Sequence, residues 1–100
     1  MQKRVSDFLQ EFDLETDVES RMLDLVSEAG EMAKEVLKST NYGQQDFQAS
    51  PDWEEELGDC LFSLCALANQ TDVDIDVALD KVLEKYKARF RNKGDISSGR

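Results

Sequence analysis

The apolar residues of the chain recur at intervals of three and four, which is the period of an amphipathic α-helix. The pattern predicts a short helix over residues 2–12, a long one over residues 18–37 and a last one over residues 75–90. The polar segments "DLETD" and "TDVDID" carry side chains that commonly cap helix ends. Because β-branched residues are sparse and no segment alternates as a strand does, the chain is expected to be all-α.

A third helix is expected from residue 51 to about residue 69, with Ser50 as its N-cap and Pro51 as its first helical residue. It is apolar nearly all round, unlike the other helices. One side carries Trp53, Leu57, Cys60, Leu61, Leu64, Leu67 and Ala68, and most of the other side carries Phe62, Cys65 and Ala66. Such a helix has to be buried on more than one face. Three further helices of this length do not suffice for that, so we expect a homodimer or homotetramer.

The length of 100 residues suits one domain with a modest core. We therefore expect a four-helix bundle over residues 1–92 that is completed by dimerisation, followed by a flexible C-terminal tail over residues 93–100. No apolar run is long enough to span a membrane, and the N-terminal segment lacks the apolar centre of a signal peptide. The sequence thus predicts a soluble, cytoplasmic protein.

The composition excludes several kinds of function. The net charge of −10 opposes binding to nucleic acid polymers and to anionic membrane surfaces. The absence of histidine removes Ser-His-Asp triads, Cys-His proteases and ordinary zinc sites. The two cysteines, Cys60 and Cys65, point away from each other on one helix, so we expect reduced thiols that pack in the core.

Carboxylates concentrate on the third helix, where they interrupt an apolar surface. Glu56, Asp59 and Ser63 stand at i, i+3, i+7 and share one narrow strip of the helix. Two ionised carboxylates buried side by side are unfavourable unless protons or cations compensate them. The strip therefore indicates that a positive charge belongs beside it, while Ser63 is expected to pack or to bond the backbone.

The second helix carries a matching acidic ridge, formed by Asp24, Glu28, Glu31 and Glu35. Because the ridge lies opposite the apolar stripe of the same helix, it is open to two interpretations. It is either a solvated outer face or one half of a ligand set that the third helix completes. Four carboxylates from two helices form an oxygen-only set, which suits Mg²⁺ or Mn²⁺. Magnesium commonly shares its coordination with substrate phosphates, so this pattern favours metal-dependent phosphate chemistry.

Two segments, "ESRMLDLVSEAGEMAKEVLKS" and "WEEELGDCLFSLCALA", resemble the MazG-like, all-α nucleoside triphosphate pyrophosphohydrolases. The signature of this family is E-x-x-E followed some tens of residues later by E-x-x-D. Glu28 and Glu31 match the first pair, and Glu56 and Asp59 match the second. The single E-x-x-E pattern is weak in an acidic helix, whereas both pairs in order, with these flanks and a following "LEKYKARF", are fairly specific. The resemblance covers roughly residues 18–91.

The resemblance implies Mg²⁺-dependent hydrolysis of nucleoside or deoxynucleoside triphosphates to the monophosphate and pyrophosphate, with a house-cleaning role on non-canonical nucleotides. It places the metal at Glu28, Glu31, Glu56 and Asp59. A triphosphate is anionic, so a carboxylate-lined site can hold it only through bridging cations. A carboxylate that is not saturated by metal would take the proton of the attacking water, and Glu31 and Glu35 are the candidates.

The fourth helix carries Lys81, Lys85 and Arg89 at i, i+4, i+8, and this stripe either clamps phosphates or is a solvated basic flank. A basic segment similar to N-x-K-F-x-x-R is typical of the family here, but Leu83 replaces its asparagine, which leaves base and sugar recognition open. Trp53 either stacks on a base or belongs to the core.

Two other hypotheses about the function remain open. One is a related phosphohydrolase on the same scaffold, such as a phosphoribosyl-ATP pyrophosphatase. The other is a non-catalytic helical interaction module whose carboxylates are only surface charge. Substrate profiling would separate the first of these from the main prediction, and titration with Mg²⁺ and a non-hydrolysable triphosphate would separate the second.

Overall fold

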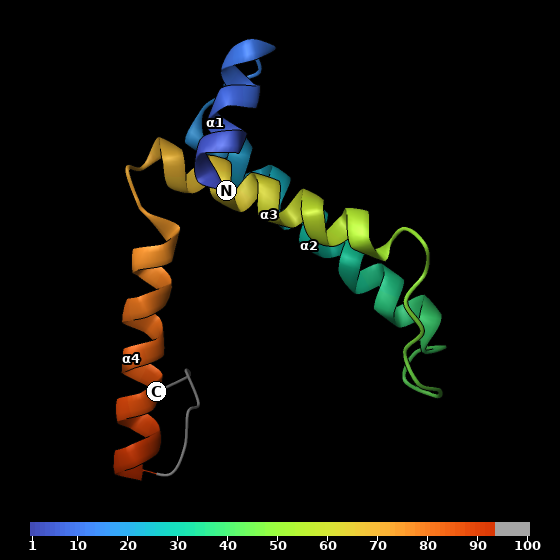
Figure 1. Cartoon of the computed structure of the whole chain (residues 1–100). Helices are drawn as coiled ribbons and strands as arrows, with labels where there is room; N and C mark the ends of the chain where they lie inside the picture. Colours follow the sequence, from blue (N-terminus) through green and yellow to red (C-terminus); the bar gives the residue numbers. More distant parts are fainter. Residues whose placement is uncertain (94–100) are drawn as a thin grey trace.

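The computed structural model describes residues 1–93, and within them the chain forms four α-helices and no strand (Figure 1). The helices are α1 (Gln2–Glu11), α2 (Val18–Ser39), α3 (Trp53–Gln70) and α4 (Ile75–Lys93). The prediction of an all-α chain with four helices is confirmed. The predicted tail lies outside the described residues except for Lys93, which ends α4. No helix in the described part is long and apolar enough to cross a membrane.

Short polar side chains determine where the helices begin. The Asp17 carboxylate accepts a hydrogen bond of 2.7 Å from the Ser20 N–H and caps α2. The Asp74 carboxylate does the same for α4, because it accepts hydrogen bonds from the Asp76 and Val77 N–H groups at 2.9 and 3.2 Å. Each cap satisfies backbone donors that have no partner inside the helix.

The start predicted for α3 was two residues too early. Pro51 and Asp52 form a turn, and the helix begins at Trp53. The Ser50 hydroxyl accepts a hydrogen bond from the Asp52 N–H, while the Ser50 carbonyl accepts one from the Trp53 N–H. Ser50 therefore organises the turn that leads into α3, because the bond to its carbonyl closes a tighter ring than an α-helical turn does.

The helices α2 and α3 form a long antiparallel pair, and α1 crosses α3 near its C-terminal half (Figure 1). The small core lies at this crossing and consists of Val5, Leu9, Cys65 and Ala66, with Phe62 and Ile75 packed against it. A polar clasp holds α1 in place: Asn69 and Gln2 exchange two hydrogen bonds, of 2.9 and 3.0 Å. The Gln2 carbonyl oxygen Oε1 also accepts a bond of 2.7 Å from the Ile75 N–H.

The last helix, α4, points away from the other three, which gives the chain an open, angular shape (Figure 1). Its radius of gyration is 16.7 Å, against about 13 Å for a compact chain of this length. Leu57, Leu61 and Leu64 on α3 remain 41–46% exposed. In a single chain α3 therefore keeps an exposed apolar side, which agrees with the expectation that this helix has to be buried on more than one face.

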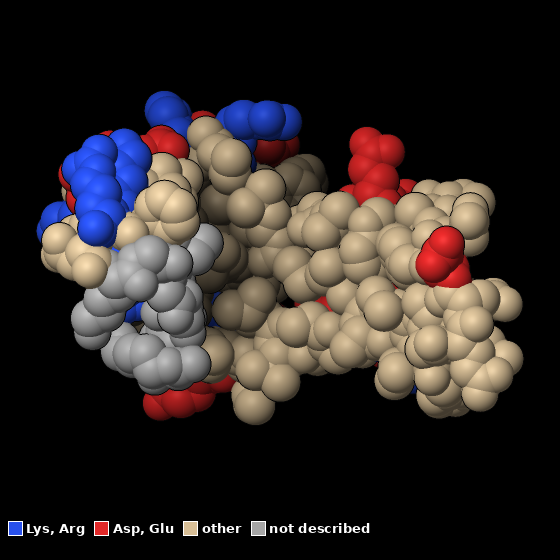
Figure 2. Space-filling model, turned by 90° about the horizontal axis from the view of Figure 1, so that it is seen from below, with Lys and Arg blue, Asp and Glu red and all other residues tan. Residues whose placement is uncertain are grey.

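The face of the molecule drawn in Figure 2 is largely uncharged over the α2–α3 part, with isolated carboxylates, while Lys and Arg gather toward α4.

The orientation of the acidic and apolar sides of α2 was not expected. The half-buried side of α2 carries Glu28 and Glu35, whereas Met22 and Val26 of the apolar stripe are 45% and 57% exposed. The acidic ridge is therefore divided, because Glu28 and Glu35 are half-buried while Asp24 and Glu31 are exposed. Met22 and Val26 of the apolar stripe turn outward.

Candidate active site

The carboxylates of α2 and α3 meet in the groove between the two helices. A hollow of about 260 Å³, called the acid hollow below, is lined by Asp24, Glu28, Asp59, Phe62 and Ser63. The antiparallel arrangement sets one turn of α2 against one turn of α3, so that carboxylates of the two motifs face each other. Glu28 and Asp59 are close enough for a hydrogen bond between their carboxyl groups. The acids of two separate sequence motifs therefore share one site.

Several carboxylates lie close together in the groove, and the pKa values of two of them are raised. Burial raises the pKa of Glu28, and the neighbouring Asp59, Glu31 and Asp24 raise it further. Burial likewise raises the pKa of Glu56, with contributions from Glu35, Asp52, Glu31 and Asp59. Glu31 contributes to the raised pKa of both Glu28 and Glu56. Desolvation and like charges both disfavour ionisation, and both are relieved by a bound cation.

A divalent cation fits the chemistry of these donors. One carboxylate oxygen of Glu56, Oε1, is buried and has no hydrogen-bond partner. A buried acceptor of this kind is unfavourable unless a proton or a cation lies beside it. Within residues 1–93, however, no three Asp, Glu, Cys or His side chains are grouped so that they could hold one ion together. The carboxylates thus face each other in couples, and an ion between two of them would take its remaining oxygens from water or from substrate.

The structure does not bring every candidate residue to this groove. Lys81, Lys85 and Arg89 lie on α4, which turns away from the α2–α3 pair in Figure 1 and contributes no lining to the acid hollow. Lys85 and Arg89 lie over the Tyr86 ring, 5.5 and 6.0 Å from its centroid. The basic stripe and the carboxylates are therefore separate surfaces of a single chain.

Trp53 is half-buried at the start of α3 and packs its ring edge-on against Phe47, with 4.9 Å between the centroids. The ring thus anchors the loop between α2 and α3. Cys65 is fully buried, as predicted for a core thiol. Cys60 instead lies at the rim of the acidic groove, where its thiol donates a hydrogen bond of 3.2 Å to the Met32 sulfur. Burial, followed by the nearby carboxylates, raises the pKa of the Cys60 thiol and keeps it protonated.

Two residues of the site were missed by sequence reasoning. Phe62 forms part of the wall of the acid hollow, although its position on α3 indicated only core packing. Arg21 is buried, with 7% exposure, and its guanidinium carbon lies 5.7 Å from the Phe62 ring centroid. The same guanidinium forms an ion pair of 3.6 Å with Asp24. A lone arginine inside an apolar period was the available signal, since such a cation needs a partner when it is buried.

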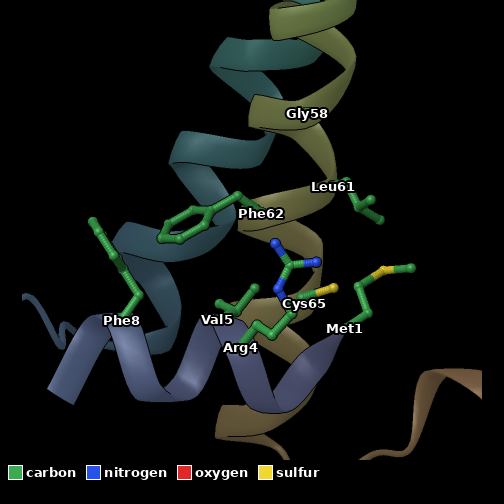
Figure 3. Close-up of a pocket in the computed structure, with 8 residues that line it drawn as sticks. All are labelled: Met1, Arg4, Val5, Phe8, Gly58, Leu61, Phe62 and Cys65. Atoms are coloured by element: carbon green, nitrogen blue, oxygen red, sulfur yellow. The ribbon is translucent and has the colours of Figure 1, made fainter. Parts of the chain in front are cut away.

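Phe62 also borders a larger hollow of about 400 Å³, the apolar hollow, between α1 and α3. Figure 3 shows that α1 contributes Met1, Arg4, Val5 and Phe8, and that α3 contributes Gly58, Leu61, Phe62 and Cys65. This hollow contains no carboxylate. Size alone therefore does not identify the candidate active site, because the larger hollow lacks the carboxylates that line the acid hollow.

Comparison with known proteins agrees with this geometry. The chain is similar to the solved Bacillus-conserved MazG protein, a nucleotide pyrophosphohydrolase, with 33% identity, a TM-score of 0.71 and coverage of 86% of this chain and 84% of that one. The solved structure of YpjD from Bacillus subtilis matches with 35% identity and a TM-score of 0.71, over 88% of this chain and 90% of the other. The fold and the site thus define an all-α protein of the nucleotide pyrophosphohydrolase class.

The family model for the MazG nucleotide pyrophosphohydrolase domain matches residues 16–93. The chain belongs to this family, which confirms the resemblance inferred from the two carboxylate motifs. It is also 39% identical over 75 residues to the protein YpjD of Bacillus subtilis (strain 168). That match covers 72% of this chain and 66% of the relative, so just under two thirds of the relative's length is spanned.

Proposed function

We propose that the protein hydrolyses nucleoside or deoxynucleoside triphosphates, non-canonical ones among them, to the monophosphate and pyrophosphate in the cytoplasm. The observation that carries the proposal is the facing of Glu28 on α2 with Asp59 on α3, beside a buried Glu56 oxygen that has no partner. In a non-catalytic interaction module the carboxylates would point away from one another into solvent. These acids instead raise each other's pKa, which is unfavourable in the absence of a cationic ligand.

In this proposal Glu28, Glu31, Glu56 and Asp59 hold Mg²⁺, with Mn²⁺ as a substitute. Held by these carboxylates, Mg²⁺ would supply the positive charge that an anionic substrate needs in order to approach an anionic groove. Glu31 or Glu35 accepts the proton of a water molecule as its oxygen attacks the α-phosphorus. The bond from the α-phosphorus to the bridging oxygen breaks, and pyrophosphate leaves. Glu35 suits the role of base because it is half-buried and lies next to Glu56.

We further propose that the working form is a homodimer or homotetramer. Support comes from the exposed leucines of α3 and from the outward apolar stripe of α2, which a second copy would cover. Lys81, Lys85 and Arg89 of one copy could then reach phosphates held at the carboxylates of another. Trp53 would contribute at the start of α3, either by positioning the neighbouring loop or by contact with the substrate.

Pyrophosphate release from a panel of ordinary and damaged nucleoside triphosphates, with and without Mg²⁺, tests the proposal. We expect pyrophosphate release that requires Mg²⁺ and is lost in Glu56→Gln. Glu54→Gln is the matched control, because Glu54 lies two residues away and is exposed. Hydrolysis of phosphoribosyl-ATP alone would support the related phosphohydrolase instead. Failure to bind Mg²⁺ with a non-hydrolysable triphosphate, measured by calorimetry, would leave only a helical interaction module.

A further inference from the structure

A second polar hollow, called the amide hollow below, lies farther along α3 than the acid hollow, where α3 meets α1 and the link between α1 and α2. On α3, Asp59 and Ser63 line the acid hollow, while Ala66 and Gln70 line the amide hollow. These four positions follow i, i+4, i+7, i+11 and so share one face of the helix. The helix rises roughly 10 Å between Asp59 and Ala66. A ligand lying along this face would therefore contact both hollows.

The amide hollow has a volume of about 330 Å³, which falls in the range of roughly 300–1,000 Å³ typical of small-molecule sites. Its polar lining comes from α1, the link between α1 and α2, and both long helices. It includes the side-chain amides of Gln10, Asn69 and Gln70, and the two opposite charges of Glu15 and Arg21. Such a lining offers both donors and acceptors with no net charge. It suits an uncharged molecule that is read by hydrogen bonds.

Arg21 makes this hollow more than a surface depression. The side chain of Arg21 is only 9% exposed, and its Nε–H has no hydrogen-bond partner. The other nitrogens of the guanidinium are engaged, one with the Leu14 carbonyl at 3.4 Å and one with Asp24 at 3.6 Å. A buried donor without an acceptor is unfavourable. A ligand in the hollow that draws the Arg21 side chain toward it would supply the missing acceptor. Gln70 donates a hydrogen bond to the Thr16 carbonyl and holds the link beside the hollow.

We propose that the amide hollow binds the nucleoside of the substrate while the triphosphate lies at the acid hollow. This inference rests on the function proposed above. Arg21 joins the two hollows, because it lines the first and contacts both Asp24 and Phe62, which line the second. A nucleoside triphosphate has the same division, with a neutral, hydrogen-bonding base and sugar at one end and a polyanion at the other.

The apolar hollow fits the nucleoside less well. Among the described residues that line it, none carries an amide or a hydroxyl side chain, and Arg4 has the only charged side chain. Figure 3 shows the Arg4 guanidinium extending toward Phe62 and Leu61. A base placed there would bury its polar edge with few partners. The amide hollow satisfies those edges, so base discrimination is assigned to Arg21, Glu15 and Gln10.

Steady-state kinetics of pyrophosphate release from a panel of nucleoside triphosphates test the assignment. The variants are Arg21→Met, Glu15→Gln and Gln10→Met, and the matched control is Glu11→Gln, an exposed carboxylate outside the hollow. For Arg21→Met we expect KM to rise by roughly tenfold or more, since a hydrogen bond to a charged group is lost. Smaller increases, and a changed order of preference among the bases, are expected for Glu15→Gln and Gln10→Met.

Inorganic tripolyphosphate provides the second measurement, because it carries the polyanion without a nucleoside. Its inhibition constant is expected to stay unchanged in Glu15→Gln and Gln10→Met, because neither residue lines the acid hollow. Arg21→Met is left out of this comparison, because Arg21 pairs with Asp24 of the acid hollow. Circular dichroism shows whether Arg21→Met folds. If it does not, Glu15→Gln and Gln10→Met test the assignment, because both side chains are exposed and their replacement should not affect folding. Unchanged KM and base order in folded, active variants would overturn the assignment, as would a parallel rise for tripolyphosphate in Glu15→Gln and Gln10→Met. A wild-type protein that hydrolyses no triphosphate would instead refute the proposed function itself.

Discussion

The α2–α3 pair and α4 carry opposite charges and differ in how they are packed. The groove between α2 and α3 holds facing carboxylates, with Glu28 and Glu56 partly shielded from water. The helix α4 carries a basic stripe that includes Lys81 and Lys85, both exposed, and in Figure 1 it stands apart from that groove. A phosphate substrate needs cations around it. The chain therefore presents its facing carboxylates and its basic stripe on separate surfaces, whereas the proposed function would need both near the substrate.

The apolar surfaces show the same separation. Val77, Leu79, Leu83 and Phe90 on α4 are 45–59% exposed, and the α2 stripe also faces outward. Burying such side chains contributes roughly 1.5–3 kcal/mol each, so a chain that leaves them in water lacks much of its possible stability. The comparison teaches that assembly, or closure of α4, would both cover these surfaces and unite the two charged halves.

The largest expected effect is the loss of one facing carboxylate. Glu28→Gln should lower kcat/KM for triphosphate hydrolysis by more than about a hundredfold, because even indirect disturbance of a metal site costs that much. Glu19→Gln, an exposed position near the start of the same helix, should change little. The measurement is Mg²⁺-dependent pyrophosphate release, together with Mn²⁺ affinity by calorimetry. Equal activity in the two variants would remove the carboxylate groove from the mechanism.

The helices were predicted from the sequence alone, because periodicity is a local property of the chain, whereas the pairing of the two carboxylate motifs was inferred from the resemblance to a family and from the need of buried carboxylates for a cation. The sequence could not predict which neighbour each face of a helix would meet. Met22 and Val26 have the period of a core stripe, yet they face outward, since the Glu28 side of α2 packs against α3. Arg21 was missed for the same reason. Its burial depends on the crossing of α1 and α3, which no local pattern encodes.

The second effect concerns the exposed leucines of α3. Leu61→Asp should shift the protein from dimer or tetramer to monomer and reduce hydrolysis with it, since a charge would enter an apolar interface at two symmetry-related places. Light scattering over a dilution series measures the mass. Gln44→Asp adds the same charge on an exposed loop and should leave both mass and activity unchanged. A wild-type protein that stays monomeric at high concentration would instead favour closure of α4 within one chain.

A mixing experiment asks whether the basic stripe acts between copies. Lys85→Glu should lower activity by roughly tenfold, because a charge-assisted phosphate contact becomes repulsive. Unfolded and refolded together in equal amounts, Lys85→Glu and Glu28→Gln should regain about one quarter of wild-type activity, since half of random dimers are mixed and each has one intact site. Activity equal to the average of the two separate variants would place both halves of the site in one chain.

The smallest expected effect is a pH dependence of stability that distinguishes the groove from the rest of the fold. The pKa values of Glu28 and Glu56 are raised above their ordinary 4.5, so the folded state binds protons more tightly there than the unfolded state does. Their contribution to stability is complete below 4.5 and is lost as pH rises through the raised values. Without divalent ions, the melting temperature should therefore climb as pH falls from neutrality toward that value.

Glu56→Gln should flatten this climb, and Mg²⁺ should stabilise the wild type at neutral pH more than it stabilises the variant. Asp17 provides an internal contrast, because its hydrogen bonds with Ser20 lower its pKa below the ordinary 3.8. Its contribution is present above 3.8 and disappears only as pH falls through the lowered value. The two windows do not overlap, so Asp17→Ala should lower the melting temperature at neutral pH without changing the slope above 4.5. An equal slope in wild type and Glu56→Gln would mean that the carboxylates of the groove face water as freely as those outside it.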